Sequence, residues 1–121
     1  MEQISPKLQN QLSQFQQMQQ QAQAIATQRL QMELQMKEVE RALEEVEKLG
    51  EDAEVYKSIG SILVKSEKAK LGEELKERKE TLDLRIKTLQ KQEEKIQNRL
   101  KEMQAQIQEE LKSVKMRKAA G

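Results

Sequence analysis

The side chains that most often carry out chemistry in proteins are scarce in this sequence of 121 residues. It contains no cysteine and no histidine, so thiolate nucleophiles, disulfides and imidazole proton transfer are excluded. Its 21 acidic residues could serve acid–base catalysis or bind a cation, but they are dispersed among 22 basic residues. Its four glycines do not form a phosphate-binding loop. We therefore expect no enzyme, no cofactor and no metal site.

The composition also narrows the choice of fold and partner. Hydrophobic residues make up 36% of the chain and aromatic residues 2%, against 36% charged residues, which is too little apolar material for a compact core. The formal net charge of +1 gives no strong field to attract nucleic acid or an anionic membrane. Apolar runs such as Ile62–Val64 are far too short for a signal peptide or a membrane span. We expect a cytoplasmic protein.

Two tracts of apolar residues recur at alternating spacings of three and four, which is typical of coiled-coil helices. The first tract is broken only by Arg29, and the second is interrupted by Lys79, Glu93 and Glu110. The first contains Phe15, Met18, Ala22, Ile25, Met32, Met36, Val39, Leu43 and Val46. The second contains Leu75, Leu82, Ile86, Leu89, Ile96, Leu100, Met103, Ile107 and Val114.

Local signals set the ends of these helices. Ser5 and Pro6 form an N-cap and first-turn pair, and Leu49-Gly50 supplies a stop, because glycine can close a helix in the left-handed conformation. This predicts a helix over about 6–50. The second tract predicts a helix over 67–117, with Ser66 as its cap. We expect one domain over 1–121.

The segment between the helices favours strands. Over 53–66, β-branched and aromatic residues cluster around Gly60-Ser61, which predicts a short β-hairpin. A two-stranded hairpin has open edges and is marginally stable alone, so we expect it to pair with hairpins of other subunits in a closed barrel. A hairpin covered by its own coil is the alternative. The predicted assembly residues are Val55, Tyr56, Ile59, Ile62, Leu63 and Val64.

If the two helices fold back on each other, one register places most polar interruptions of one tract opposite polar residues of the other. It places Phe15 opposite Ile107 and Arg29 opposite Glu93, so the two charges meet in one layer. A shift of one heptad would bury both charges against apolar residues. The sequence therefore predicts an antiparallel coiled-coil hairpin, with a loosely packed seam and solvated charges as the alternative. The same register also sets Leu8 opposite Val114, Gln11 opposite Glu110 and Val39 opposite Leu82.

The ends of the coil far from the hairpin carry flexible apolar side chains, which can adapt to many partner sequences. Leu12, Leu111 and Met116 are expected to stay exposed, whereas Phe15 and Ile107 fit ordinary coil core equally well. Coil ends fray easily, so a partner chain could bind there. The candidate binding residues are Leu8, Leu12, Phe15, Met103, Ile107, Leu111, Val114 and Met116.

Four segments together resemble the prefoldin beta-subunit family of archaea: Phe15–Gln21, Ala53–Gly60, Ile62–Lys65 and Gly72–Leu75. The resemblance covers essentially the whole chain, and the hairpin is its specific part. It implies a hexamer of two alpha and four beta subunits whose hairpins form a double barrel. It also implies that coiled-coil tips capture unfolded polypeptides and pass them to a group II chaperonin without ATP.

A coiled-coil scaffold or tether without client binding is the competing function. It would need the same heptads, but it gives no reason for a segment rich in valine, isoleucine and tyrosine between two long helices. The hairpin segment therefore favours the chaperone interpretation.

Overall fold

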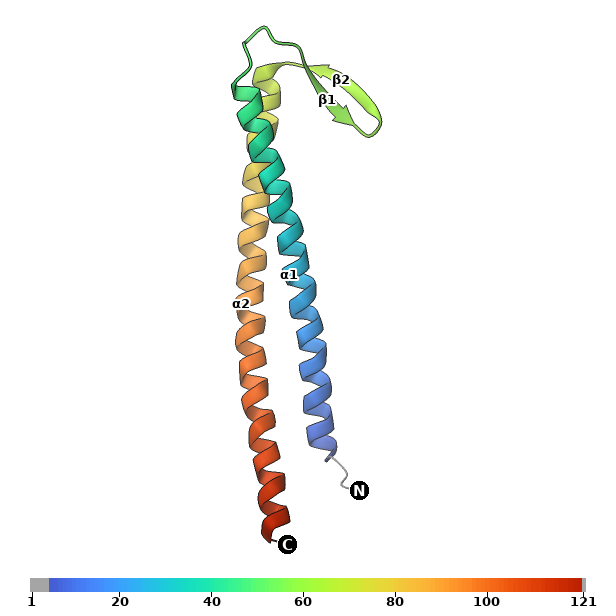
Figure 1. Ribbon diagram of the computed structural model, residues 1–121, viewed down its shortest axis with the longest axis vertical. Coiled ribbons are helices and arrows are strands. Elements are labelled where there is room, and N and C mark those ends of the chain that lie inside the picture. Colours follow the sequence, from blue (N-terminus) through green and yellow to red (C-terminus); the bar gives the residue numbers. More distant parts are fainter. Residues whose placement is uncertain (1–4, 121) are drawn as a thin grey trace. The chain divides into compact units, whose positions relative to one another are not determined.

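The computed structural model describes residues 5–120, with side chains as far as Arg117. Its elements follow the order α1 (Pro6–Glu47), β1 (Val55–Ile59), β2 (Ile62–Ser66) and α2 (Lys68–Ala120) (Figure 1). Two long helices thus flank one short antiparallel β-hairpin, which confirms the predicted fold class. The assembly of strands from several subunits into a barrel stays a prediction, because it concerns further chains.

The start of α1 follows the capping rule. The hydroxyl of Ser5 accepts a hydrogen bond from the amide of Leu8 at 3.1 Å, and its carbonyl accepts one from the amide of Gln9 at 2.9 Å. Pro6, which has no N–H to satisfy, is the first helical residue.

The end of α1 differs from the expectation. The helix ends at Glu47 instead of Gly50, since the amide of Leu49 turns back to the carbonyl of Val46 at 3.1 Å, a tighter i to i+3 bond. Among the described glycines only Gly60 has a positive φ, so the expected left-handed closure at Gly50 is wrong. Just beyond the end of the helix, Lys68 Nζ donates a hydrogen bond of 2.7 Å to the carbonyl of Leu49.

The cap of α2 also lies one residue later than expected. Ser66 is the last residue of β2, where it pairs with Val55, and the carbonyl of Glu67 accepts the amide of Leu71 at 2.9 Å. Glu67 therefore occupies the position that the sequence analysis gave to Ser66. Gly72 lies inside α2 without interrupting it, and a Cβ placed there would meet nothing within 4 Å.

The strands pair directly across a turn at Gly60-Ser61, where Gly60 has a φ of 59°. A two-residue turn needs this conformation, and glycine adopts it without strain. The register runs from Val55 opposite Ser66 to Ile59 opposite Ile62. The side chains of two paired residues lie on the same side of the sheet.

The chain divides into two compact units. One unit comprises the described residues up to Gln28 with those from Leu89 onward, and the other comprises Arg29–Thr88, including the hairpin. In the second unit a core of Val39, Leu43 and Leu82 is buried. Met32, Met36 and Leu75 pack against this core. Val39 and Leu82 thus lie in one cluster, as the antiparallel register predicts.

Between residues 5 and 120, neither helix is apolar enough over a sufficient length to cross a membrane.

Candidate functional site

The hairpin presents most of the residues that the sequence assigned to assembly. Their exposed fractions run from 43% for Val64 to 70% for Leu63, whereas Val55 at the base is buried. The sheet has only two strands, so the outer backbone edges of both strands lack a strand partner among the described residues. The other exposed assembly residues are Tyr56, Ile59 and Ile62.

Strand register separates these residues into two faces. Val55, Ile59, Ile62 and Val64 lie on one side of the sheet, because paired residues and residues two apart share a face. Tyr56, Ser58, Leu63 and Lys65 lie on the other side. The first face is the more apolar, so it is the better candidate for the inside of a closed sheet.

Charged side chains make contacts on both faces of the hairpin. Lys57 Nζ donates a hydrogen bond of 2.8 Å to Glu74 Oε2 on α2. This hydrogen bond lowers the pKa of Glu74 below its ordinary value, and the charges of Lys57 and Lys70 act in the same direction against desolvation. On the other face of the sheet, Glu54 accepts the hydroxyl of Tyr56 at 3.3 Å and pairs with Lys65 at 3.8 Å.

The second candidate surface lies in the unit that contains the ends of α1 and α2. Leu8, Met103 and Ile107 are buried, and Phe15 and Val114 are half-buried. Leu12 and Leu111 are exposed by 41% and 44%, and Met116 by 75%. The eight predicted binding residues therefore comprise a buried group, a half-buried group and three exposed side chains. Their role in binding stays a prediction.

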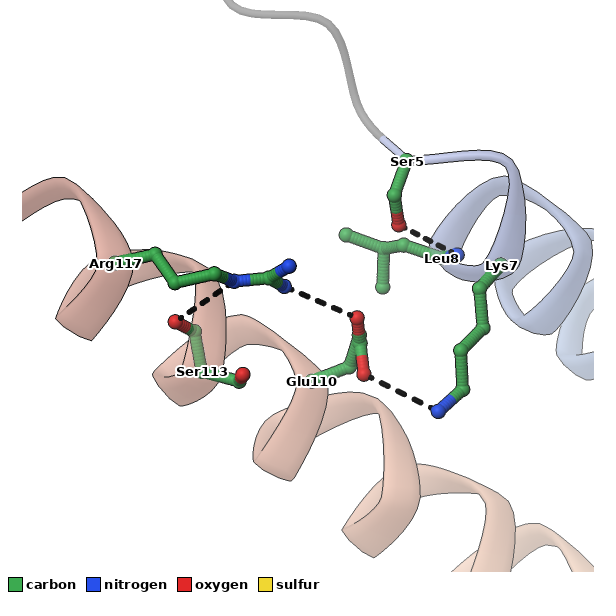
Figure 2. Close-up of polar contacts among 6 residues, drawn as sticks. All are labelled: Ser5, Lys7, Leu8, Glu110, Ser113 and Arg117. Carbon is green, nitrogen blue, oxygen red and sulfur yellow. Dashed lines mark hydrogen bonds and ion pairs between the residues drawn. The ribbon is translucent and has the colours of Figure 1, made fainter.

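A polar cluster lies among these apolar residues. The carboxylate of Glu110, whose side chain is only 15% exposed, pairs with Lys7 Nζ of α1 and with Arg117 Nη2 of α2, each at 3.5 Å (Figure 2). Arg117 Nε also donates to the carbonyl of Ser113 at 3.4 Å. The pair with Lys7 therefore links the two helices of this unit, whereas the pair with Arg117 lies within α2.

Gln11 lines the same cavity as Lys7, Glu110 and Arg117. Its Oε1 atom is buried and accepts no hydrogen bond from the described residues. A buried acceptor without a partner costs about 1–3 kcal/mol. The sequence had placed Gln11 opposite Glu110 but had missed Lys7 and Arg117, although Arg117 lies two helical turns after Glu110.

Sequence reasoning also missed three exposed leucines, Leu30 and Leu34 on α1 and Leu84 on α2. Each is more than half exposed and lies outside the heptad seam. Their position off the seam was readable from the spacing. They belong to the unit formed by Arg29–Thr88.

The predicted register charges, Arg29 and Glu93, are both partly buried. Arg29 Nη1 donates to Glu33 Oε1 at 2.9 Å, one helical turn away. Arg29 and Glu93 belong to different compact units, so their pairing stays a prediction.

The described residues contain no group of three acidic side chains that could hold a metal ion. The features that stand out are therefore apolar surface and strand edges, and both suit binding to other polypeptides.

Comparisons with known proteins agree with this picture. The model of the family described as "Prefoldin subunit" matches residues 9–114. Prefoldin subunit beta of Methanothrix thermoacetophila is 48% identical over 108 residues, covering 89% of this chain and 90% of that protein. The same subunit of Archaeoglobus fulgidus is also 48% identical over 108 residues, covering 89% and 93%.

Solved structures show the same likeness. The crystal structure of the prefoldin beta subunit from Thermococcus strain KS-1 superposes with a TM-score of 0.83 at 43% identity, covering 92% of this chain and 97% of that one. The beta2 subunit of the same strain gives a TM-score of 0.68 at 26% identity, covering 75% and 97%. With a family match over most of its length and beta subunits among its relatives, the chain belongs to the prefoldin subunit family, a family of chaperones whose subunits form hetero-oligomers.

Proposed function

We propose that this chain is a beta-type subunit that joins alpha-type subunits in a hexamer of two alpha and four beta chains. The hexamer holds unfolded polypeptides at the coiled-coil tips, without ATP, and delivers them to a group II chaperonin in the cytoplasm. The family membership supports the chaperone role, and the beta-type relatives support the subunit assignment.

Client capture is supported by the exposure of Leu12, Leu111 and Met116 at the ends of α1 and α2. Leucine and methionine surface of this kind favours binding to apolar segments of many sequences, because flexible side chains adapt to different partners. Several subunits that engage one client raise the total affinity through effective concentration while each contact stays reversible.

Assembly is supported by the hairpin, which has two open edges and apolar residues on both faces. Pairing with strands of other subunits would satisfy the edges and cover Ile59, Ile62 and Val64. The same assembly would hold several tips around one client.

The test uses the chain reconstituted with an alpha-type subunit and a chemically denatured protein whose aggregation is followed by light scattering, without nucleotide. Removal of residues 1–14 and 104–121 should abolish suppression of aggregation while the hexamer mass is retained. Suppression that survives this truncation would exclude capture at the tips and would favour a scaffold whose binding sites lie elsewhere.

A matched pair of variants sharpens the test. Leu12→Gln with Leu111→Gln should weaken capture several-fold, because each substitution removes partly exposed apolar surface at the tip. Leu30→Gln with Leu34→Gln removes two leucines of greater exposure from the other unit and should leave capture unchanged. Equal losses from both pairs would mean that general surface hydrophobicity, not the tip, binds the client.

A further inference from the structure

Two polar residues occupy seam positions at the ends of the helices, each beside a buried apolar residue. Gln11 of α1 and Glu110 of α2 line one cavity, and Leu8 and Ile107, one turn away from each, are buried. We call Gln11 and Glu110 the tip layer. In a coiled coil, a position between two buried leucine or isoleucine positions is normally apolar, because burial there stabilises the seam.

The polar atoms of Gln11 and Glu110 are poorly partnered for groups with so little exposure. Glu110 has lost most of its hydration, yet its partners Lys7 and Arg117 are 70% and 67% exposed and lie at 3.5 Å. Exposed cations of this kind contribute little and are screened by salt. Gln11 Oε1 is buried and accepts no hydrogen bond in the described chain, so burying it is unfavourable.

We propose that the tip layer keeps this end of the coil only weakly closed, so that Leu8, Phe15 and Ile107 become available to an unfolded polypeptide by local opening. Glu110 and Gln11 are then positioning residues for capture, since they act through the apolar side chains beside them. The inference rests on the proposed capture of clients at the tips.

The ion pairs give the opening a salt dependence. Added salt weakens the attraction of Lys7 and Arg117 for Glu110, so the tip should open more often as ionic strength rises. Hydrogen exchange of backbone amides near Leu8 and Ile107 follows this opening in the assembled hexamer, because helix ends that separate also fray.

The decisive variant carries Gln11→Leu with Glu110→Leu and replaces the polar layer by an apolar one. Replacement of enclosed charged groups by well-packed apolar residues is often neutral or stabilising, so amide exchange at the tip should slow roughly tenfold or more. Capture of the denatured protein should fall several-fold, although the variant is more apolar than the natural chain. Its tip exchange should no longer respond to salt.

The matched control carries Gln9→Leu with Glu94→Leu, the same two substitutions at exposed positions that do not line the cavity. It should keep the natural rate and salt response of exchange, and it should capture clients at least as well as the natural chain. A variant with a leucine layer that exchanges slowly yet captures normally would overturn the proposal, as would unchanged exchange. Capture lost by truncation but unaffected by the leucine layer would leave tip binding intact and refute only the role of opening.

Discussion

Lys57 Nζ lies 2.8 Å from Glu74 Oε2, and this contact ties the middle of β1 to the first turns of α2. Lys57 also lies opposite Val64 in the strand register, on the more apolar face of the sheet. The contact therefore sets which face of the hairpin turns toward α2, within the unit that contains both elements.

Acid should release this contact. The pKa of Glu74 is lowered in the folded chain by its hydrogen bond with Lys57, so the contribution of the contact is fully present above the ordinary pKa of the carboxyl group. It is lost as the pH falls through the lowered pKa. Glu74→Gln should therefore be less stable than the natural chain at neutral pH, with the difference vanishing in acid.

Thermal unfolding of both proteins across this pH range measures the difference. Glu73→Gln is the control, because it removes a neighbouring charge without removing the contact with Lys57. A stability gap between Glu74→Gln and the natural chain that persists in strong acid would show that the pair does not act through its charge.

Shortening a buried side chain should lower the free energy of unfolding much more than shortening an exposed one. Leu82→Ala removes a buried side chain from the cluster with Val39 and Leu43, and we expect a loss of about 2–5 kcal/mol in the free energy of unfolding. Leu84→Ala removes the same atoms from an exposed site and should cost within about 0.5 kcal/mol. Urea unfolding of the isolated chain measures both, and similar losses would contradict the assigned packing.

Assembly should depend on the apolar residues beside the turn of the hairpin. Ile62→Ser changes a residue that is 64% exposed in the single chain, so it should leave the helix content of the chain unchanged. We expect it to prevent formation of the hexamer with an alpha-type subunit, as judged by light scattering after size-exclusion chromatography. Leu30→Ser, at a similarly exposed site on α1, should assemble normally. Normal assembly of both variants would exclude the hairpin as the interface.

A double-mutant cycle tests whether Arg29 and Glu93 interact. Arg29→Glu should destabilise the chain, and part of that loss comes from the contact with Glu33, which becomes a pair of like charges. Adding Glu93→Arg should recover stability beyond the sum of the single changes, with a coupling of about 0.5 kcal/mol or more if the two side chains share a layer. Purely additive changes in the urea midpoint would show that the sequence register is wrong there.

Heptad spacing was enough to predict the two helices and one packed cluster between them. Val39, Leu43 and Leu82 are buried together because a three-four repeat keeps one stripe of each helix on the seam. Gly60-Ser61 marked the turn, since a two-residue hairpin needs a residue that tolerates positive φ. The resemblance to prefoldin beta subunits is confirmed by the family match and by the related structures.

The features that sequence reasoning missed depend on single hydrogen bonds and long side chains. The amide of Leu49 binds the carbonyl of Val46, which ends α1 before Gly50, and no composition rule distinguishes this turn from one more helical residue. Lys7 and Arg117 reach Glu110 through flexible side chains whose direction a heptad position does not fix. The roles of the predicted binding and assembly residues stay predictions.

The single tyrosine of the chain, Tyr56, lies on β1 and is 53% exposed, and the chain has no tryptophan. Tyrosine emission from the unlabelled polypeptide therefore originates in one strand. If neighbouring strands cover that phenol, or draw its hydroxyl away from Glu54, the spectrum changes without any dye. Tyr56 is thus an intrinsic fluorescent reporter at the place where subunits are proposed to meet. Its emission can be used to measure the rate of their association.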